Sequence, residues 1–274
     1  MIACYARGAG LGHLTRVRAA LRALGREDEP VALVSGSPFV QRGAPGWDVV
    51  PSLDDVRADE VWIDAFPAGI NGELEIPDGR RVVHLARLLR WPVYEKLLPA
   101  VRPRFDVTYV CEPLAPAHEA FLRDVSDELK PLKLVDPPAR CDVQVDGWLI
   151  VHSGPDDEIR ELVGYALDMA AAEGASPTFT LIAPRRPDGL PAQVVHHDVY
   201  PAWPLGARAE RIVTAGGFNA VRQFAPWRER HRIMPFPRRL DDQFARAARV
   251  RAETGLEDVG LRSTSGTGPR PATS

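Results

Sequence analysis

The sequence predicts an α/β protein built from two doubly wound domains. A short apolar strand, a glycine-rich turn and an amphipathic helix follow one another over residues 1–24 and again over 211–224. Between these stretches, short continuous apolar runs, the pattern of buried parallel strands, alternate with helical segments. A stretch without such runs, Asp124 to Asp146, gathers prolines and separates the two sets of elements, so we interpret it as the domain linker.

In the first domain, predicted as residues 1–145, the apolar runs indicate a parallel sheet. After the first glycine turn, Leu14, Val17 and Leu21 repeat at helical spacing, and Arg16 is expected on the opposite, polar face of that helix. The expected strands are Met1–Tyr5, Pro30–Ser35, Glu60–Asp64, Arg81–Leu85 and Phe105–Val110.

The second domain, predicted as residues 146–255, repeats the alternation of strand and helix. Its last helix is expected to carry Phe244, Ala247 and Ala248 on its apolar side. Residues 256–274 have few apolar anchors and are predicted to form a disordered tail. The expected strands are Trp148–His152, Thr178–Ala183, Arg211–Thr214 and the apolar run before Pro235.

The composition excludes several classes of protein. The formal net charge is −3 and the pI is about 6.2, so no basic field marks a nucleic-acid-binding protein. Cys4, Cys111 and Cys141 lie far apart without metal-ligand spacing, which is typical of reduced thiols in a cytoplasmic protein. No apolar stretch approaches the roughly 18 residues of a membrane span. A soluble protein, attached to a membrane at most peripherally, is therefore expected.

Two glycine turns of the second domain have the features of phosphate-binding sites. Backbone N–H groups at a helix start are unpaired and lie at the positive end of the helix dipole, and glycine lets a ligand approach closely. Gly216, Gly217, Phe218 and Asn219 meet this description. Ser153 and Gly154 do so at the domain's first strand, where the acids that follow would repel a phosphate placed deeper. An ordinary strand-to-helix turn or helix cap is the alternative for both.

The segment Pro235–Gln243 adds groups suited to hydroxyls. It follows a short apolar strand and places Asp241, Asp242 and Gln243 at the start of the next helix. Carboxylate and amide side chains hydrogen bond to hydroxyl groups. A phosphate-binding helix start beside a hydroxyl-binding one is what a nucleotide-sugar requires.

The sequences Ala215-Gly-Gly-Phe-Asn219 and Pro235-Phe-Pro-Arg-Arg-Leu-Asp-Asp-Gln243 resemble the donor half of the two-domain GT-B glycosyltransferases. The likeness is greatest to the bacterial N-acetylglucosaminyltransferases that make the lipid-linked peptidoglycan precursor, and to predicted glycosyltransferases similar to them. The resemblance implies two Rossmann-like domains facing each other across a cleft. It also implies metal-independent, inverting transfer of a hexosyl or N-acetylhexosaminyl group from a UDP-sugar to a hydroxyl acceptor, which is a small molecule, a glycan or a lipid-linked compound.

The same resemblance assigns roles to individual residues. His13 is the candidate general base, in an acceptor-facing loop with Gly10, Gly12 and Arg16; a loop cap or phosphate ligand is the alternative for His13. Asp242 and Gln243 would hold sugar hydroxyls. The residues expected at the base and ribose are Val199, Tyr200 and Gln223, the last standing where the peptidoglycan enzymes have a ribose-binding glutamate.

Three further residues at predicted strand ends, Asp64, His84 and Arg90, are site candidates for which a structural or solvated role is the alternative. No cofactor is predicted, because Gly8-Ala-Gly-Leu-Gly-His13 is not the dinucleotide fingerprint. No metal site is predicted either, because His196 and His197 are adjacent on a strand and point apart. Two other functions stay open: a sugar-nucleotide epimerase of the same architecture, and a non-catalytic nucleotide-sugar-binding protein.

Overall fold

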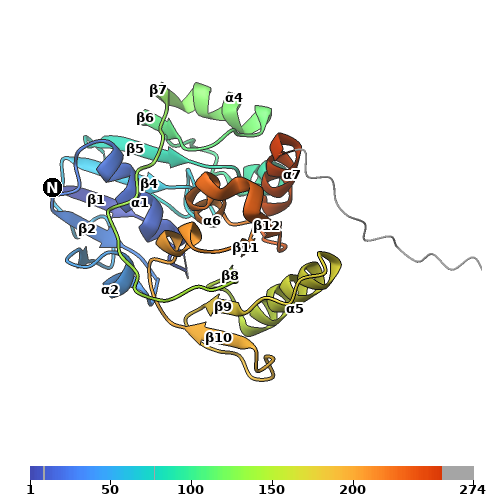
Figure 1. Ribbon diagram of the computed structural model, residues 1–274. Coiled ribbons are helices and arrows are strands. Elements are labelled where there is room, and N and C mark those ends of the chain that lie inside the picture. Colours follow the sequence, from blue (N-terminus) through green and yellow to red (C-terminus); the bar gives the residue numbers. More distant parts are fainter. Residues whose placement is uncertain (9, 77, 255–274) are drawn as a thin grey trace, which may run out of the picture.

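A computed structural model describes residues 1–8, 10–76 and 78–254, and it contains two parallel β-sheets (Figure 1). The first sheet has the strand order β3-β2-β1-β4-β5-β6-β7, and the second has the order β10-β9-β8-β11-β12. The first consists of β1 (Ile2–Tyr5), β2 (Val31–Val34), β3 (Asp48–Val49), β4 (Glu60–Asp64), β5 (Arg81–Ala86), β6 (Phe105–Val110) and β7 (Ser126–Pro131). The second consists of β8 (Trp148–Val151), β9 (Phe179–Ile182), β10 (Val194–His197), β11 (Arg211–Ala215) and β12 (His231–Met234).

Helices connect most of these strands. Among the described helices, none is long and apolar enough to cross a membrane. The α-helices are α1 (Gly12–Ala23), α2 (Val40–Gly43), α3 (Trp91–Tyr94), α4 (Pro116–Val125), α5 (Asp156–Ala172), α6 (Phe218–Gln223) and α7 (Gln243–Thr254). Three 3₁₀ helices are η1 (Glu95–Leu97), η2 (Trp203–Ala207) and η3 (Ala225–Arg230).

Each sheet is covered on both faces, as a doubly wound fold requires. Along β1, Ile2 and Cys4 join the apolar cluster under α1, whereas Ala3 and Tyr5 join the cluster on the opposite face. This alternation follows from the two-residue period of a strand. The second sheet divides in the same way between the cluster under α5 and the cluster that contains η2 residues. The predicted fold class of two doubly wound α/β domains is therefore confirmed.

Two details differ from the sequence prediction. The stretch expected to lack strands contains β7, which pairs with β6 at the edge of the first sheet. Its residues, Ser126 to Pro131, are mostly exposed, so no apolar pattern marks the strand. In α7 the buried residues are Gln243, Arg246, Ala247 and Val250, while Phe244 is 53% exposed. Polar contacts, which apolar periodicity does not register, orient this helix. The predicted tail, 256–274, lies outside the described residues.

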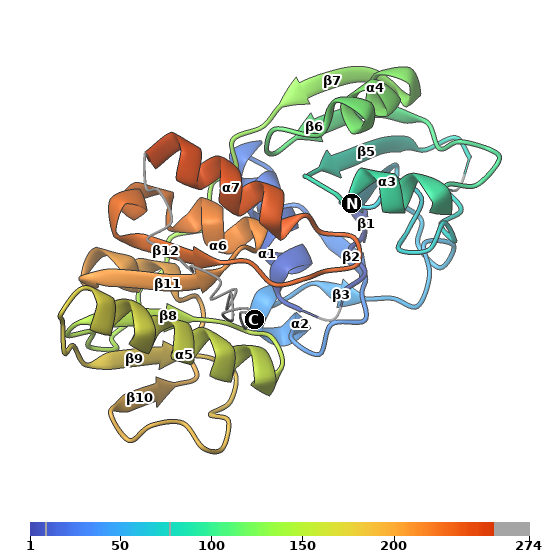
Figure 2. The same cartoon turned by 90° about the vertical axis from the view of Figure 1, so that its right-hand side faces the viewer.

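The two halves are packed closely against each other. Figures 1 and 2 show α1 of the first half beside α6 of the second. The Phe218 ring at the start of α6 joins the apolar cluster of the first half, and the Leu240 side chain joins the cluster on that sheet's other face. The Arg90 N–H also donates to Leu240 O at 2.9 Å. The two halves are therefore in direct contact through both apolar side chains and a backbone hydrogen bond.

Arg246 of α7 ties the second half to the first through buried charges. Its guanidinium, 3% exposed, donates to both carboxylate oxygens of Glu112, at 2.7 and 2.8 Å, and to Asp241 Oδ1 at 2.9 Å. It also donates to Gly216 O at 2.9 Å, in the glycine turn before α6. A buried guanidinium with these four hydrogen bonds holds α7, the glycine turn and the first half in one arrangement.

We expect Arg246→Met to lower the free energy of unfolding by about 3–5 kcal/mol, because it leaves the buried carboxylate of Glu112 without its ion-pair partner. Urea unfolding followed by circular dichroism measures this loss. The control is Arg249→Met, a half-buried position on the same helix, with an expected change within about 0.5 kcal/mol. Equal losses in the two variants would show that the ion pairs of Arg246 contribute nothing specific.

Candidate active site

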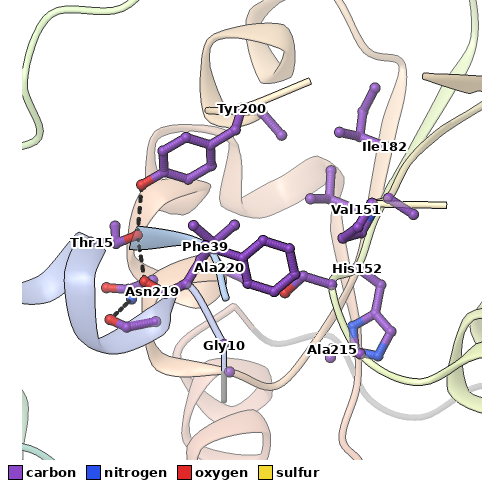
Figure 3. A pocket seen from close by; sticks show the side chains of 18 of the residues that line it. Gly10, Thr15, Phe39, Val151, His152, Ile182, Tyr200, Ala215, Asn219 and Ala220 are labelled. Carbon is purple, nitrogen blue, oxygen red and sulfur yellow. Dashed lines mark hydrogen bonds between the residues drawn. The ribbon is translucent and has the colours of Figure 1, made fainter. Parts of the chain in front are cut away.

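A cleft of about 800 Å³ lies between the two sheets, at their carboxyl ends. In each sheet the strand order reverses direction beside the first strand, at β1 and β4 in one and at β8 and β11 in the other. Ligands of open parallel sheets bind at such switch points. The loops after β1, β8 and β11 all line the cleft. Figure 3 shows Thr15 and Asn219 on one side of it, and Val151, His152 and Ile182 on the other.

His13 and Asp64 form a pair at the switch point of the first sheet. His13 is in the first turn of α1, after β1, and Asp64 ends the neighbouring strand β4. His13 Nδ1 lies 2.6 Å from Asp64 Oδ2. The Arg16 guanidinium donates to both oxygens of the same carboxylate, at 2.5 and 2.6 Å. Arg16 is thus buried, contrary to its expected place on the polar face of α1, because its charge is paired with Asp64.

The protonation states of this pair follow from its surroundings. Burial alone would raise the pKa of Asp64, but the charges of Arg16 and His13 outweigh it and hold that pKa well below its usual range. Asp64 is therefore a carboxylate that only accepts hydrogen bonds, so Nδ1 of His13 carries the proton. Burial lowers the pKa of His13, and Asp64 only partly opposes this. At neutral pH, the result is a neutral imidazole with Nε2 unprotonated.

Gly8 makes room for the unprotonated edge of His13. A Cβ atom at Gly8 would lie 2.3 Å from His13 Cδ2 and 2.5 Å from Nε2. Any side chain at this position would push the imidazole away from its place. Gly10 and Gly12, the glycines predicted for the acceptor loop, line the cleft without such crowding.

The start of α6 presents unpaired N–H groups to the cleft. The first hydrogen bond of this helix runs from Val221 N–H to Gly217 O, so the N–H groups of Phe218, Asn219 and Ala220 precede it. Asn219 Nδ2 donates to Gly12 O at 2.7 Å and joins the starts of α6 and α1. Gly216 does not line the cleft. A Cβ there would lie 3.0 Å from Gln243 O, so its glycine allows the chain segments behind the site to pack closely.

The turn after β8 brings a carboxylate, an imidazole and a guanidinium together. Ser153 and Gly154 line the cleft as predicted positions for phosphate contacts, and His152, Glu158 and Arg238 lie beside them. Glu158 accepts hydrogen bonds from both terminal nitrogens of Arg238, each at 2.5 Å, and from His152 Nε2 at 2.8 Å. Burial opposes ionisation of Glu158, but Arg238 and His152 lower its pKa. The side chain is thus a charged carboxylate at neutral pH.

Aromatic and amide side chains also line the cleft. They include Tyr200, next to Val199, with Trp203 and, from the first half, Phe39. The Tyr200 hydroxyl is 2.8 Å from Thr15 Oγ1 of α1, a contact drawn in Figure 3. Gln223 also lines the cleft, and its Nε2 donates to Asp136 Oδ1 at 2.8 Å. A glutamate at this position would place a second carboxylate against Asp136, which gives a physical reason for the amide.

The predicted sugar-binding residues occupy different places at the start of α7. Asp242 does not line the cleft; its Oδ1 accepts from Ala245 N–H at 3.0 Å and caps the helix. Gln243 lines the cleft but is 4% exposed, and its Oε1 accepts from Phe236 N–H at 3.0 Å. The carboxylate that reaches the cleft is that of Asp241, which pairs with Arg87 and Arg246.

Three solved structures resemble this fold over nearly its full length. The glycotransferase of kitacinnamycin covers 92% of this chain with 83% of its own, at 16% identity and a TM-score of 0.58. The alignment with the glycosyltransferase SnogD from Streptomyces nogalater covers 93% of this chain and 85% of SnogD, at 15% identity and a TM-score of 0.57. The alignment with the spinosyn rhamnosyltransferase SpnG complexed with thymidine diphosphate covers 93% of this chain and 85% of SpnG, at 14% identity and a TM-score of 0.56. The chain has the GT-B fold.

The expected GT-B fold is thereby confirmed, and the narrower likeness to the peptidoglycan enzymes stays a prediction. Identities this low define a fold only. The sequence matches no protein-family model, and no curated protein is significantly similar to it.

The GT-B cleft is lined by residues that the sequence did not single out, and five of the sequence candidates do not line it: Asp64, His84, Arg90, Gly216 and Asp242. His84 is fully buried and stacks on Phe105 in the core, and Arg90 donates to Arg238 O outside the cleft. Asp64, a weak candidate in the sequence, contacts His13 directly. The signal for Asp64 was its place at a strand end next to the first strand. Cleft residues that the sequence did not single out as site candidates include Phe39, Arg42, Arg87, His152, Arg185, Asp198, Trp203 and Arg238.

We expect Gly8→Ala to displace the His13 imidazole and break its hydrogen bond to Asp64, because the added Cβ overlaps Cδ2 and Nε2 of the ring. The Nδ1–H signal in a ¹⁵N–¹H imidazole spectrum should be lost or shifted, with about 1–3 kcal/mol of destabilisation from overpacking. Gly10→Ala, where a Cβ meets no atom within 4 Å, is the matched control and should leave the Nδ1–H signal and the stability unchanged. An unaltered His13 signal in the Gly8 variant would contradict this account of the loop.

Proposed function

We propose that this protein is a glycosyltransferase that moves a sugar from a nucleoside diphosphate donor to a hydroxyl-bearing acceptor. One observation carries the proposal: the switch points of both sheets face the same cleft, one with the His13–Asp64 pair and the other with the unpaired N–H groups of α6. The first arrangement suits proton removal from a hydroxyl, and the second suits a diphosphate. The alternatives of an epimerase and a binding protein differ from it in their products.

In the proposed reaction, Nε2 of His13 takes the proton of the acceptor hydroxyl as its oxygen attacks the anomeric carbon of the donor sugar. The bond from that carbon to the diphosphate breaks, and the electron pair leaves with the diphosphate. Asp64, which accepts from Nδ1–H, stabilises the imidazolium that forms. A single displacement of this kind inverts the anomeric carbon. The N–H groups at the start of α6 stabilise the leaving diphosphate, and we propose that no bound metal ion is needed.

The rest of the donor fits the remaining cleft surfaces. The faces of Tyr200 and Trp203 suit a nucleotide base, because aromatic rings stack on bases. Gln223 keeps its Oε1 for a ribose hydroxyl while its Nε2 is held by Asp136. We propose a hexosyl or N-acetylhexosaminyl group on a uridine or thymidine nucleotide. The three cysteines, all unbonded, fit a reducing compartment such as the cytoplasm.

A second cavity, of about 580 Å³, lies next to the cleft and offers space for the acceptor. The loops after β1 and β2 line both cavities, since Gly8 and Ser35 face the second while Gly10 and Phe39 face the cleft. Its walls include Val34, Val49, Val50, Pro51 and Ile70, with Arg7 at its edge. We propose an acceptor with an apolar body, whose reacting hydroxyl reaches His13 past Gly8.

Thermal unfolding with a panel of nucleoside diphosphates, including UDP and TDP, tests the donor site. A ligand at about a hundred times its Kd stabilises the folded protein by about 2.7 kcal/mol, a shift of several degrees in Tm. Ala220→Asp places a carboxylate beside the α6 N–H groups and should abolish the shift by repulsion. Ala220→Asn, of the same size but uncharged, should retain most of it. No shift with any nucleotide would overturn the proposal.

The pH dependence of kcat/KM tests the role of His13, using the donor found by that panel. Because burial lowers the pKa of His13, its neutral form dominates above the unperturbed value of about 6.5. We expect a constant kcat/KM from pH 8 to about 6.5 and a loss only below it, as the base becomes protonated. His13→Gln should reduce the rate by about 10²–10⁴ and remove this acid limb. An acid limb that persists in His13→Gln would place the base elsewhere.

Product analysis separates sugar transfer from epimerisation, because an epimerase leaves the nucleotide attached to the sugar.

A further inference from the structure

The arginines that line the cleft are all paired with carboxylates. Within the described residues these pairs are Arg16 with Asp64, Arg42 with Asp198, Arg87 with Asp241, Arg185 with Asp156 and Arg238 with Glu158. An incoming diphosphate therefore meets no unpaired guanidinium among the described cleft residues. Either the backbone N–H groups bind it alone, or one arginine exchanges its partner.

Arg238 is the arginine best placed for an exchange. Arg16 and its partner Asp64 are buried. Arg87 is buried too, and its partner Asp241 is also held by Arg246. Arg185 pairs with Asp156, which does not line the cleft. Arg42 pairs with Asp198, which follows β10 and not the predicted phosphate-binding turn after β8. Arg238, in the loop between β12 and α7, is partly exposed, and its partner Glu158, in the first turn of α5, is in the cleft wall. The pair lies beside Ser153 and Gly154, in the turn after β8.

Glu158 stands where an anion at this turn would go. A Cβ atom on Gly154 would lie 2.7 Å from Glu158 Oε2 and 2.3 Å from His152 Nε2. A phosphate in contact with Gly154 would thus lie within a few ångströms of the carboxylate, a separation at which like charges repel strongly. The Arg238 guanidinium offers a planar pair of N–H donors, which matches a phosphate as well as it matches a carboxylate.

We propose that the Glu158 carboxylate occupies the diphosphate's place in the unliganded protein, and that Arg238 passes from Glu158 to the diphosphate when the donor binds. Glu158 keeps its hydrogen bond from His152 and turns away from the arriving charge. Arg238 is then a donor-binding residue, and Glu158 is an internal competitor that weakens the binding of every anion at this turn. This inference rests on the proposed function, because it assumes a diphosphate ligand.

The experiment measures the Kd of the nucleoside diphosphate found by the thermal panel, by calorimetry, in a set of variants. Glu158→Gln should tighten binding about tenfold, because it removes the competing charge and retains an oxygen for His152. Arg238→Gln should weaken binding about ten- to a hundredfold. Glu161→Gln, an equal loss of charge at an exposed position of the same helix α5, is the control and should change the Kd less than about twofold. Circular dichroism and Tm confirm that each variant is folded.

The double variant Glu158→Gln/Arg238→Gln separates exchange from simple repulsion. If Glu158 competes for Arg238, its removal should gain little, about twofold, once Arg238 is absent. An equal gain in both backgrounds would overturn the exchange, as would unchanged or weaker binding by Glu158→Gln. The absence of nucleoside diphosphate binding by both the wild type and Glu158→Gln would instead refute the proposed function.

Discussion

The carboxylate of Asp64 is the group on which the site of the first half depends. It is 1% exposed, and a charge so deeply buried is tolerated only with ionic and hydrogen-bonded partners. Those partners, Arg16 and His13, both come from α1, so the need to pair Asp64 fixes the helix that carries the candidate base. The chain turns directly after Asp64 through Ala65, whose φ of 69° is in the left-handed region. Local strain of this kind occurs at functional sites.

Contacts between the two halves fix the position of α1 relative to the second half of the chain. Asn219 on Gly12 and Tyr200 on Thr15 each join a cleft residue to the opposite half, and Arg246 on Glu112 joins the halves outside the cleft lining. The candidate base and the candidate phosphate contacts are thus held at a set separation. Reacting groups placed in a fixed geometry can gain much of the rate that an enzyme provides.

The sequence predicted the parts of this arrangement that depend on apolar patterns and glycine. β6 was predicted to the residue, because β-branched and aromatic residues dominate Phe105–Val110, and the glycine turns before α1 and α6 line the cleft. The missing parts depend on pairing between polar residues far apart in the chain. The sequence around Arg16 does not indicate that this residue of α1 will form a buried ion pair with Asp64, at the end of β4. Likewise, Asp242 and Asp241 are adjacent acids in the sequence, and only the capping of α7 decides which of them reaches the cleft.

The charge balance of the cleft explains how several arginines can line one cavity. Several unpaired guanidinium groups facing one narrow cavity would repel each other and would be costly to desolvate. Carboxylates from the same chain reduce that cost. They also reduce the attraction of the cleft for anions in general, so a ligand must offer more than charge. The proposed nucleotide-sugar would do so, because its base, ribose and sugar could contact the aromatic, amide and carboxylate side chains that surround the paired arginines. Charge pairing within the cleft therefore favours selectivity over affinity.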